Sequence, residues 1–336
     1  MNILVTGGTG FIGSHTAVAL AEAGFRPILV DDFSNSQASV LDGLAKILSE
    51  KPTFYQQDCN DYDAMCRILK TEQITGVIHF AASKAVGESM EQPLKYYYNN
   101  LGSLTTLLRA MQAEGVANLI FSSSCTVYGE PEKLPVTEET PVQPASSVYG
   151  NTKQIGEEIL RDVAAADPAF HIISLRYFNP IGAHPSAHIG ELPLGVPGNL
   201  VPFITQTAVG MRPSLTIFGN DYPTSDGTCV RDYIHVVDLA EAHVAALKNL
   251  ADAPEAKENY QVFNVGTGQG NTVLELVKTF EEVSGQPLHY KLGPRRSGDI
   301  SAVYADATKV QRELGWNAKR SLREALTDAW RWQQSL

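Results

Sequence analysis

The regular alternation of short apolar runs with longer segments of helical spacing constrains the fold of this chain more than any other feature. We expect strands at Asn2–Thr6, Pro27–Asp31, Thr53–Gln57, Val77–Ala81, Asn118–Ser122 and His171–Tyr177, and helices between them at Phe11–Ala23, Asp61–Lys70, Leu94–Glu114 and Val148–Ala166. Strands that alternate with helices form βαβ units and therefore a parallel sheet. The unbroken apolar run at Ile28–Val30 is typical of a strand that is covered on both faces.

The alternation breaks after Phe178, where residues 180–198 and 219–229 are rich in glycine and proline and predict long loops. Further helices are expected at Leu200–Gly210, Val236–Leu250, Thr272–Val283 and Leu322–Gln333, with a strand at Tyr260–Val265. We therefore expect an α/β fold: a doubly wound parallel-sheet Rossmann domain over residues 1–178 and a smaller mixed α/β substrate-binding lobe over 179–336. Strands and helices after residue 230 are expected to return to the first domain. A single α/β domain with loop-rich decoration is the plainer alternative.

The composition limits the kinds of partner. The 336 residues carry a net charge of −11, which argues against nucleic acid or an anionic membrane as the main partner. No stretch approaches the roughly 18 apolar residues that a membrane helix needs. No Lys or Arg precedes Arg26, so we expect no secretory signal, and the four separated cysteines do not form a disulfide framework. We therefore expect a cytoplasmic protein with no nucleic-acid or membrane partner.

A glycine-rich loop follows the first expected strand and begins the first expected helix. Gly8, Gly10 and Gly13 give the pattern Gly-x-Gly-x-x-Gly, with Gly7 as a further glycine. Glycines permit a tight turn and let a pyrophosphate approach the amides at the helix N-terminus. Asp31 ends the next strand 18 residues after Gly13, where a carboxylate accepts hydrogen bonds from ribose hydroxyls and repels a 2′-phosphate. This pattern favours NAD over NADP; the alternative is a structural turn followed by a solvated acidic residue.

Tyr149 and Lys153 form a Tyr-x-x-x-Lys pair on an expected helix. Residues four apart share a helical face, so the phenol and the ammonium can point into one cleft. A tyrosine pKa of about 10 is too high for a base at neutral pH, and a nearby cation lowers it by about 1–3 units. Lys153 and an oxidised nicotinamide ring together would bring the pKa of Tyr149 closer to neutral pH. Ser124 follows a strand at the edge where open parallel sheets bind ligands. An exposed helix pair is the alternative.

The chain resembles a known family at these motifs. Thr6–Gly13, Ser122–Gly129 and Tyr149-x-x-x-Lys153 resemble the extended short-chain dehydrogenase/reductases. Three later segments are more specific and resemble the UDP-glucose 4-epimerase branch of that family: Leu175–Pro185, Gly219–Thr224 and Gly227–His235. The likeness covers nearly the whole chain.

The resemblance implies roles for individual residues: Tyr149 as the catalytic base, Lys153 as the partner that tunes its pKa, and Ser124 as the hydroxyl that bridges to the sugar. The implied cofactor is NAD, contacted by Gly7, Gly10, Phe11, Ile12, Gly13, Asp31, Asp32, Phe33, Ser34, Asn35, Ser36, Asp58, Cys59, Phe80, Ala81, Ala82, Lys84, Asn99, Ser122, Ser124, Tyr149, Lys153, Tyr177 and Phe178. The implied UDP-sugar contacts are Ser124, Tyr149, Asn179, Asn199, Leu200, Thr216, Ile217, Phe218, Arg231, Tyr233, Arg296, Asp299 and Val303. No metal is implied, and His184 and His188 are expected to be loop residues. As an alternative, Asp58 is a turn residue.

The implied reaction inverts C4 of a UDP-hexose and interconverts UDP-glucose and UDP-galactose. The tyrosine would take the proton of the C4 hydroxyl while hydride passes to tightly bound NAD, and the 4-keto intermediate would rotate before hydride returns. Arg231, Arg295 and Arg296 would provide the local positive field for the diphosphate. Because the family is dimeric, the resemblance also implies a homodimer through the helices at Leu94–Glu114 and Val148–Ala166, although an apolar stripe on either helix is equally typical of a core.

Val303 departs from the pattern of those family members that are restricted to unacetylated hexoses, which have a tyrosine wall beside the sugar at this position. Valine is much smaller, so the pocket has room for a 2-N-acetyl group. We therefore expect that UDP-GlcNAc and UDP-GalNAc are also substrates, unless Tyr304 or another side chain fills the gap.

Other functions remain as alternatives. The same fold supports nucleotide-sugar 4,6-dehydratases and decarboxylases, but the dehydratases resemble Thr-Asp-Glu where this chain has Ser124-Cys125-Thr126. A simple NAD-dependent sugar dehydrogenase would release NADH. A non-catalytic protein that binds NAD or a nucleotide sugar would not need the Ser124, Tyr149 and Lys153 trio.

Overall fold

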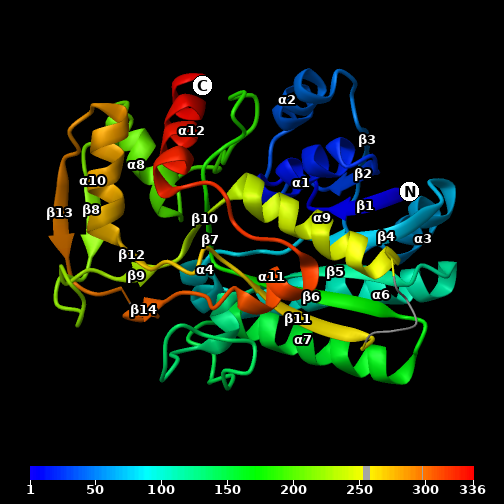
Figure 1. The fold of residues 1–336 in the computed structure, drawn as a ribbon. Coiled ribbons are helices and arrows are strands. Elements are labelled where there is room, and N and C mark those ends of the chain that lie inside the picture. Colours follow the sequence, from blue (N-terminus) through cyan, green and yellow to red (C-terminus); the bar gives the residue numbers. More distant parts are fainter. Residues whose placement is uncertain (253–257, 297) are drawn as a thin grey trace.

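A seven-stranded parallel sheet forms the centre of the protein. The computed structural model describes residues 1–252, 258–296 and 298–336. The sheet has the order β11-β6-β5-β4-β1-β2-β3 (Figure 1). Its strands are β1 (Asn2–Thr6), β2 (Arg26–Asp31), β3 (Thr53–Gln56), β4 (Ile74–His79), β5 (Asn118–Ser124), β6 (His171–Tyr177) and β11 (Tyr260–Val265). Every neighbouring pair is parallel, which confirms the predicted doubly wound fold class.

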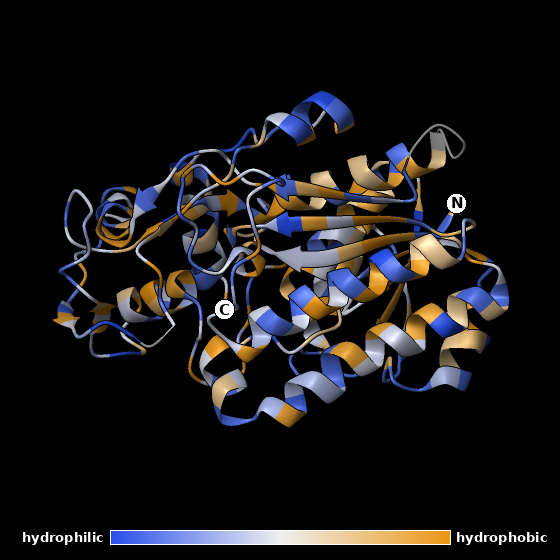
Figure 2. Ribbon diagram, turned by 90° about the horizontal axis from the view of Figure 1, so that it is seen from below, coloured by the Kyte–Doolittle hydropathy of each residue, from blue (hydrophilic) through white to orange (hydrophobic). Residues whose placement is uncertain are grey.

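Helices cover both faces of this sheet. Because strand side chains alternate between faces, Ile3 and Val5 enter one core and Leu4 enters the other. The first face is covered by α1 (Phe11–Glu22), α2 (Ser39–Leu48), α9 (Val236–Asp252) and α11 (Thr308–Leu314), and the second by α3 (Tyr62–Thr71), α6 (Gly102–Glu114) and α7 (Val148–Ala166). Figure 2 shows hydrophobic residues along the central strands and mixed colouring on the covering helices. The two cores explain why these strands have continuous apolar sequences.

A second, smaller lobe lies beyond the carboxyl ends of the strands (Figure 1). It has its own core, which includes Ile204, Phe280 and Leu326. Its helices are α8 (Leu200–Ala208), α10 (Val273–Ser284) and α12 (Leu322–Gln334), and its paired strands are β8 (Leu215–Phe218) and β13 (Tyr290–Gly293). Short strands join the two lobes: β7 (Asn179–Ile181), β9 (Val230–Arg231), β10 (Tyr233–His235), β12 (Asn271–Thr272) and β14 (Ala302–Val303).

The chain passes between the lobes more than once. After β6 it enters the second lobe through β7 and α8, and it then comes back to the sheet with α9, which packs on α1. β11 adds to the edge of the sheet beside β6, with Tyr260 opposite Ile172. The lobes are therefore tied by several crossings of the backbone.

Several predicted elements have the expected bounds, and others differ for local reasons. β1, β6, β11 and α7 agree residue for residue. β4 begins and ends earlier than predicted, at Ile74 and His79, and the amide of Phe80 still donates to the carbonyl of Thr6 on β1. The single helix predicted at Leu94–Glu114 is divided into α5 (Pro93–Tyr96), a π-helix η1 (Tyr97–Leu101) and α6. The helices α2 and α4 (Val86–Glu91) were not predicted.

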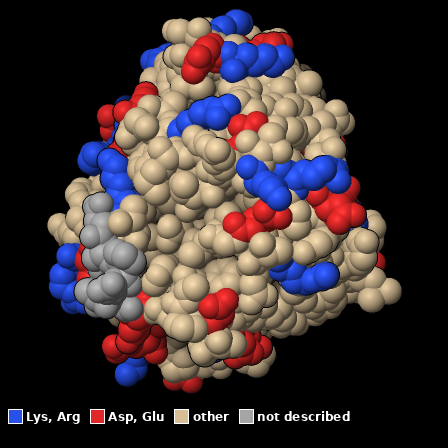
Figure 3. All heavy atoms as spheres, turned by 90° about the vertical axis from the view of Figure 1, so that its right-hand side faces the viewer, with Lys and Arg blue, Asp and Glu red and all other residues tan. Residues whose placement is uncertain are grey.

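Within residues 1–252, 258–296 and 298–336, no helix combines the length and the apolar character that crossing a bilayer requires. On the face shown in Figure 3, Lys and Arg are interspersed with Asp and Glu.

Candidate active site

The expected cofactor residues lie around the carboxyl ends of the strands of the central sheet. From β1 the chain proceeds to β2 and β3 on one side, whereas β4, β5 and β6 follow on the other side. A crevice forms outside the carboxyl ends of strands at such a reversal of strand order. The glycine loop follows β1, Phe80–Lys84 follow β4, Ser124 ends β5, and Phe178 follows β6.

The glycine loop has the geometry of an anion cradle. Gly7 has φ +67°, and the amide of Gly10 donates to the carbonyl of Gly7 at 3.0 Å. A Cβ added to Gly13 would lie 2.2 Å from that same carbonyl oxygen, so only glycine fits. α1 begins after Gly10 with no side-chain cap and no acidic residue in its first turn, which leaves its N-terminal amides available to an anion. This arrangement fits a dinucleotide pyrophosphate.

Asp31 is buried beside the loop and has room for one more donor. Its carboxylate accepts hydrogen bonds from the amide of Thr9 (3.1 Å), the amide of Phe33 (3.0 Å) and the hydroxyl of Ser36 (2.8 Å). A carboxylate has about four lone-pair sites, so one remains for a ribose hydroxyl. The same hydrogen bonds hold Thr9, Phe33 and Ser36 around the position expected for the adenosine ribose.

The remaining cofactor-side residues differ in how they lie. Asp32 and Asp58 accept hydrogen bonds within their own turns, Asp58 from the backbone and side chain of Asn60. Cys59 is buried, and burial raises the pKa of its thiol. Asn99 lies on η1 and its amide donates to the hydroxyl of Ser83 at 3.3 Å, beside the segment that follows β4.

Ser124, Tyr149 and Lys153 are brought together by β5 and α7. Ser147 caps α7 by accepting from the amide of Gly150 at 3.0 Å, so Tyr149 lies in the first turn. The Ser124 hydroxyl forms a hydrogen bond with the phenol of Tyr149. Lys153 follows one turn later, and its ammonium donates to the carbonyl of Ser122 at 2.6 Å and lies 5.9 Å from the ring centroid of Tyr149.

Burial dominates the electrostatics of this trio. It raises the pKa of the Tyr149 phenol above its ordinary value, although the hydrogen bond with Ser124 acts in the opposite direction. Burial also lowers the pKa of Lys153 to about 8, and the charge of Glu157 opposes that shift. The protein alone therefore does not lower the pKa of Tyr149 toward neutral pH. The predicted lowering needs the second positive group, the oxidised nicotinamide, beside the phenol.

The expected diphosphate residues converge in the second lobe. Arg296 donates to both carboxylate oxygens of Asp299, at 3.2 and 2.9 Å, and Arg231 lies 3.9 Å from one of them. The Arg296 guanidinium also lies 5.8 Å from the ring centroid of Phe218, which is largely exposed. Arg295, the third residue expected to contribute to this field, pairs with Asp221 at 2.7 Å, and its guanidinium lies over a neighbouring tyrosine ring.

The residues expected to face the hexose lie on the short strands between the lobes. Asn179 on β7 is paired with Tyr233 on β10, and Val303 on β14 is paired with Arg231 on β9. Val303 is buried in a small apolar cluster with Phe178, and Cys125 packs against the same cluster.

Tyr304 does not fill the space that valine leaves. Its ring lies against Gly270, where an added Cβ would come within 3.0 Å of the ring. Tyr304 lies immediately after β14, whose last residue is Val303. The other expected substrate-side residues lie at the ends of neighbouring elements: Asn199 immediately before α8, Leu200 at its start, and Thr216, Ile217 and Phe218 on β8.

Asn100 is a site residue that the sequence did not reveal. Its side chain accepts from the amide of Ser83 (2.8 Å) and donates to the carbonyl of Ser83 (3.0 Å) and the hydroxyl of Thr152 (3.0 Å). It therefore fixes the segment after β4 against α7, next to Lys153. The adjacent asparagine pair within an expected helix was the only signal, and the π-helix that turns both side chains inward is visible only in the structure.

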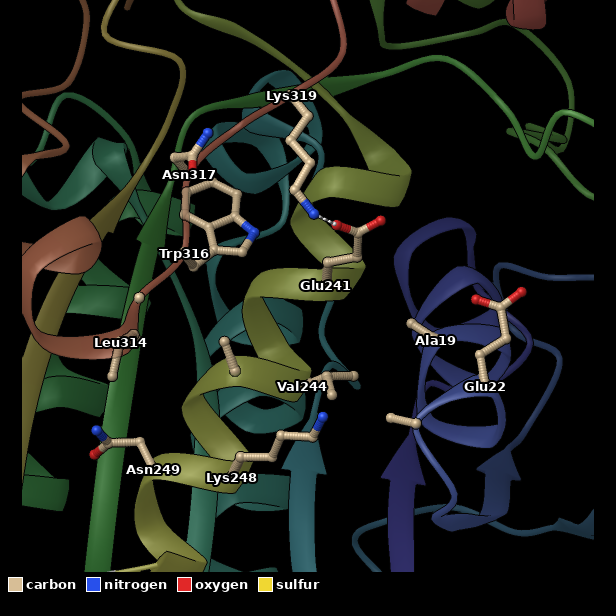
Figure 4. A pocket seen from close by; sticks show the side chains of 13 residues that line it. Ala19, Glu22, Glu241, Val244, Lys248, Asn249, Leu314, Trp316, Asn317 and Lys319 are labelled. Atoms are coloured by element: carbon tan, nitrogen blue, oxygen red, sulfur yellow. Dashed lines mark hydrogen bonds and ion pairs between the residues drawn. The ribbon is translucent and has the colours of Figure 1, made fainter.

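One hollow lies away from these residues. Its volume is about 530 Å³, and it is bounded by α1, α9 and the segment 314–319, with the Lys319–Glu241 ion pair at its rim (Figure 4). It contains none of the predicted site residues, and His184 and His188 lie in the loop between β7 and α8. No group of three or more metal-binding side chains occurs in the part of the chain that the structure describes.

Comparisons with known proteins match the chain over nearly its whole length. A family model described as GDP-mannose 4,6 dehydratase matches residues 4–329. The UDP-glucose 4-epimerase of Bacillus subtilis (strain 168) is 51% identical over 100% of this chain and 97% of its own length. A crystal structure of UDP-glucose-4-epimerase from Stenotrophomonas maltophila, with bound NAD and formylated UDP-arabinopyranose, is 47% identical with a TM-score of 0.96 over 100% of this chain and 98% of that one. The structure from Bifidobacterium longum, in complex with NAD+ and UDP, is 46% identical with the same TM-score and coverage.

Substitution of Gly13 tests the cradle. We expect Gly13→Ala to weaken the binding of added NAD by at least about tenfold, or ~1.4 kcal/mol, because the methyl group forces the carbonyl of Gly7 to move. Calorimetric titration of protein from which the bound NAD has been removed measures this effect. Gly87→Ala is the matched control, since a Cβ there meets no atom within 4 Å, and it should bind NAD as the wild type does. Equal affinities for all three proteins would contradict the assignment.

Proposed function

The chain belongs to the UDP-glucose 4-epimerase family of the extended short-chain dehydrogenase/reductases, and on this basis we propose that it interconverts UDP-glucose and UDP-galactose with NAD as its cofactor. It is thus an isomerase. The observation that carries the proposal is the placement of Ser124, Tyr149 and Lys153 at the same sheet edge as the glycine loop.

The proton transfer falls to Tyr149. Its phenolate, favoured by the positive charges of Lys153 and of the oxidised nicotinamide, takes the proton of the C4 hydroxyl, and the resulting phenol later gives it back. Ser124 bridges the phenol and that hydroxyl by hydrogen bonds. Lys153 holds a fixed positive charge behind the ring through its bond to Ser122. The chemistry that NAD supplies when bound is the acceptance and return of the C4 hydride.

The substrate is anchored at its nucleotide end. Arg231 and Arg296 supply paired donors for the diphosphate, and Phe218 offers an exposed ring to the base. Anchoring there leaves the hexose free to turn over, so that hydride returns to the opposite face of C4. NAD has to stay bound throughout, because its loss would leave the ketose stranded.

Dehydration is a weaker proposal for this site, although the matching family model is described by that reaction. Removal of a proton at C5 and loss of the C6 hydroxyl require a further acid/base pair. Burial raises the pKa of the Cys125 thiol to about 12, so it does not serve as that base. The dehydratases resemble Thr-Asp-Glu where this chain has Ser124-Cys125-Thr126, so no carboxylate is present at these positions.

Epimerisation without added cofactor tests the proposal. We expect the purified protein to contain NAD and to convert UDP-galactose to UDP-glucose with none added, because the hydride returns in each cycle. Tyr149→Phe should lower kcat by about 10²- to 10⁴-fold while NAD content stays unchanged. Tyr290→Phe, on exposed β13, serves as the control. Activity that strictly consumes added NAD, with net NADH released, would overturn the assignment in favour of a dehydrogenase.

We also propose that the site accepts UDP-GlcNAc and UDP-GalNAc, because Val303 is small and the Tyr304 ring lies against Gly270. Val303→Tyr should reduce turnover of the acetylated pair by at least about tenfold and spare the unacetylated pair. Product analysis with both pairs measures this, with Val303→Ala as the matched control. Absence of acetylated turnover in the wild type would end the idea.

We further propose a homodimer, whose interface includes α4, α5 and η1 beside α7. Met90, Leu94 and Tyr98 are 58%, 81% and 74% exposed there, which is unusual for apolar side chains on neighbouring helices. Leu94→Glu should produce a monomer in equilibrium sedimentation, whereas Leu292→Glu on exposed β13 should not. A wild-type monomer at micromolar concentration would disprove the interface.

We make two broader proposals, one on where the protein is found and one on which part of the chain binds each ligand. All four cysteines are free thiols, which suits the reducing cytoplasm. We propose that residues 1–178, with α9 and β11, bind NAD and that 179–336 mainly bind the UDP-sugar.

A further inference from the structure

One carboxylate touches both walls of the cleft. Oε1 of Glu191 accepts a hydrogen bond from Nζ of Lys84 at 3.3 Å and from Nδ2 of Asn199 at 2.5 Å. Lys84 lies after β4 in the sheet domain, among the expected NAD contacts. Asn199 lies immediately before α8 in the second lobe, among the expected UDP-sugar contacts. A single oxygen atom therefore joins a cofactor-side residue to a substrate-side residue.

The backbone around Glu191 is held in place from a third direction. Its carbonyl accepts from the indole of Trp332 on α12 at 3.0 Å. The preceding Gly190 is bridged to Ala183 and lies so close to the same indole that an added Cβ would come within 2.4 Å of it. The Glu191 side chain is only 12% exposed. The carboxylate is thus presented by a rigid segment and does not belong to a freely moving loop.

A purely stabilising role does not account for this contact. The Lys84 side chain is 43% exposed, and an ion pair at such a position contributes about 0–1 kcal/mol to folding. However, NAD binding would depend on the position of Lys84, and UDP-sugar binding would depend on the position of Asn199. Because they share one acceptor atom, movement of either partner changes the hydrogen bond of the other.

We propose that Glu191 is a positioning residue that holds Lys84 and Asn199 in register across the cleft, and so couples retention of NAD to binding of the UDP-sugar. The inference rests on the proposed function for its ligands, but the coupling itself does not require turnover. UDP bound in the second lobe fixes Asn199, which fixes Glu191 and through it Lys84. Bound UDP should therefore slow the loss of NAD.

The experiment measures NAD retention directly. Purified wild-type protein is dialysed with and without saturating UDP, and the rate of NAD loss is followed by the NAD that remains bound. We expect UDP to slow the loss in the wild type, and expect this protection to fall by at least about threefold in Glu191→Gln and Glu191→Ala. Glu191→Gln keeps the size and an acceptor for Asn199 but removes the charge that Lys84 requires. Glu282→Gln is the control, since its carboxylate pairs with Arg323 on the exposed surface of α10.

Double substitutions separate positioning from a general loss of stability. The effects of Lys84→Met and Glu191→Gln on protection should be non-additive by at least about twofold, because each removes the same contact. In turnover, Glu191→Gln should raise KM for UDP-galactose more than it lowers kcat. Unchanged protection in both Glu191 variants, or full additivity with Lys84→Met, would overturn the inference even if the protein is an epimerase. If the wild type epimerises neither UDP-hexose pair but shows the coupling, the proposed function fails and the positioning role stands.

Discussion

One face of α7 is bonded to three consecutive residues at the end of β5, and the rest of the candidate site depends on these contacts. Tyr149, Lys153 and Glu157 recur every four residues on α7, and they bond to Ser124, Ser122 and Ser123 at the end of β5. Glu157 in turn forms a buried ion pair with Arg176 on β6. A buried charge is tolerated only when it is paired and hydrogen-bonded, so these contacts fix the distance between helix and strand. The phenol is held over the sheet edge by a framework that has little freedom to move.

Much of this framework was predictable because it is local. The bounds of α7 follow from a serine cap and a helical spacing, and those of β1 and β6 from continuous apolar runs. The Rossmann class and the trio at its edge follow from the order of these elements. For the single helices and strands, the signal lies within the element and its immediate neighbours, and the physical cause acts over the same range.

Contacts between distant segments escaped prediction. Glu191 meets Lys84 across a separation of 107 residues, and nothing near it in sequence marks it as different from other acidic residues. Asn100 depends on a π-helix that no spacing rule indicates, and the ion pair of Arg295 with Asp221 joins two separate loops. The raised pKa of Tyr149 likewise comes from burial, which depends on the whole fold. Residue type and spacing identify which groups are present, whereas tertiary packing decides which of them meet.

The burial of the Cys125 thiol, beside Ser124, affects how easily the candidate site is oxidised. Cys125 adjoins Ser124 and packs against the apolar cluster that contains Val303, where an oxidised sulfur would intrude on the position proposed for the hexose. Alkylating agents and peroxides react with thiolates, and a pKa of about 12 keeps this sulfur protonated at neutral pH. Burial thus keeps the Cys125 sulfur in its protonated, less reactive form. We therefore expect the candidate site to tolerate this cysteine under oxidative stress.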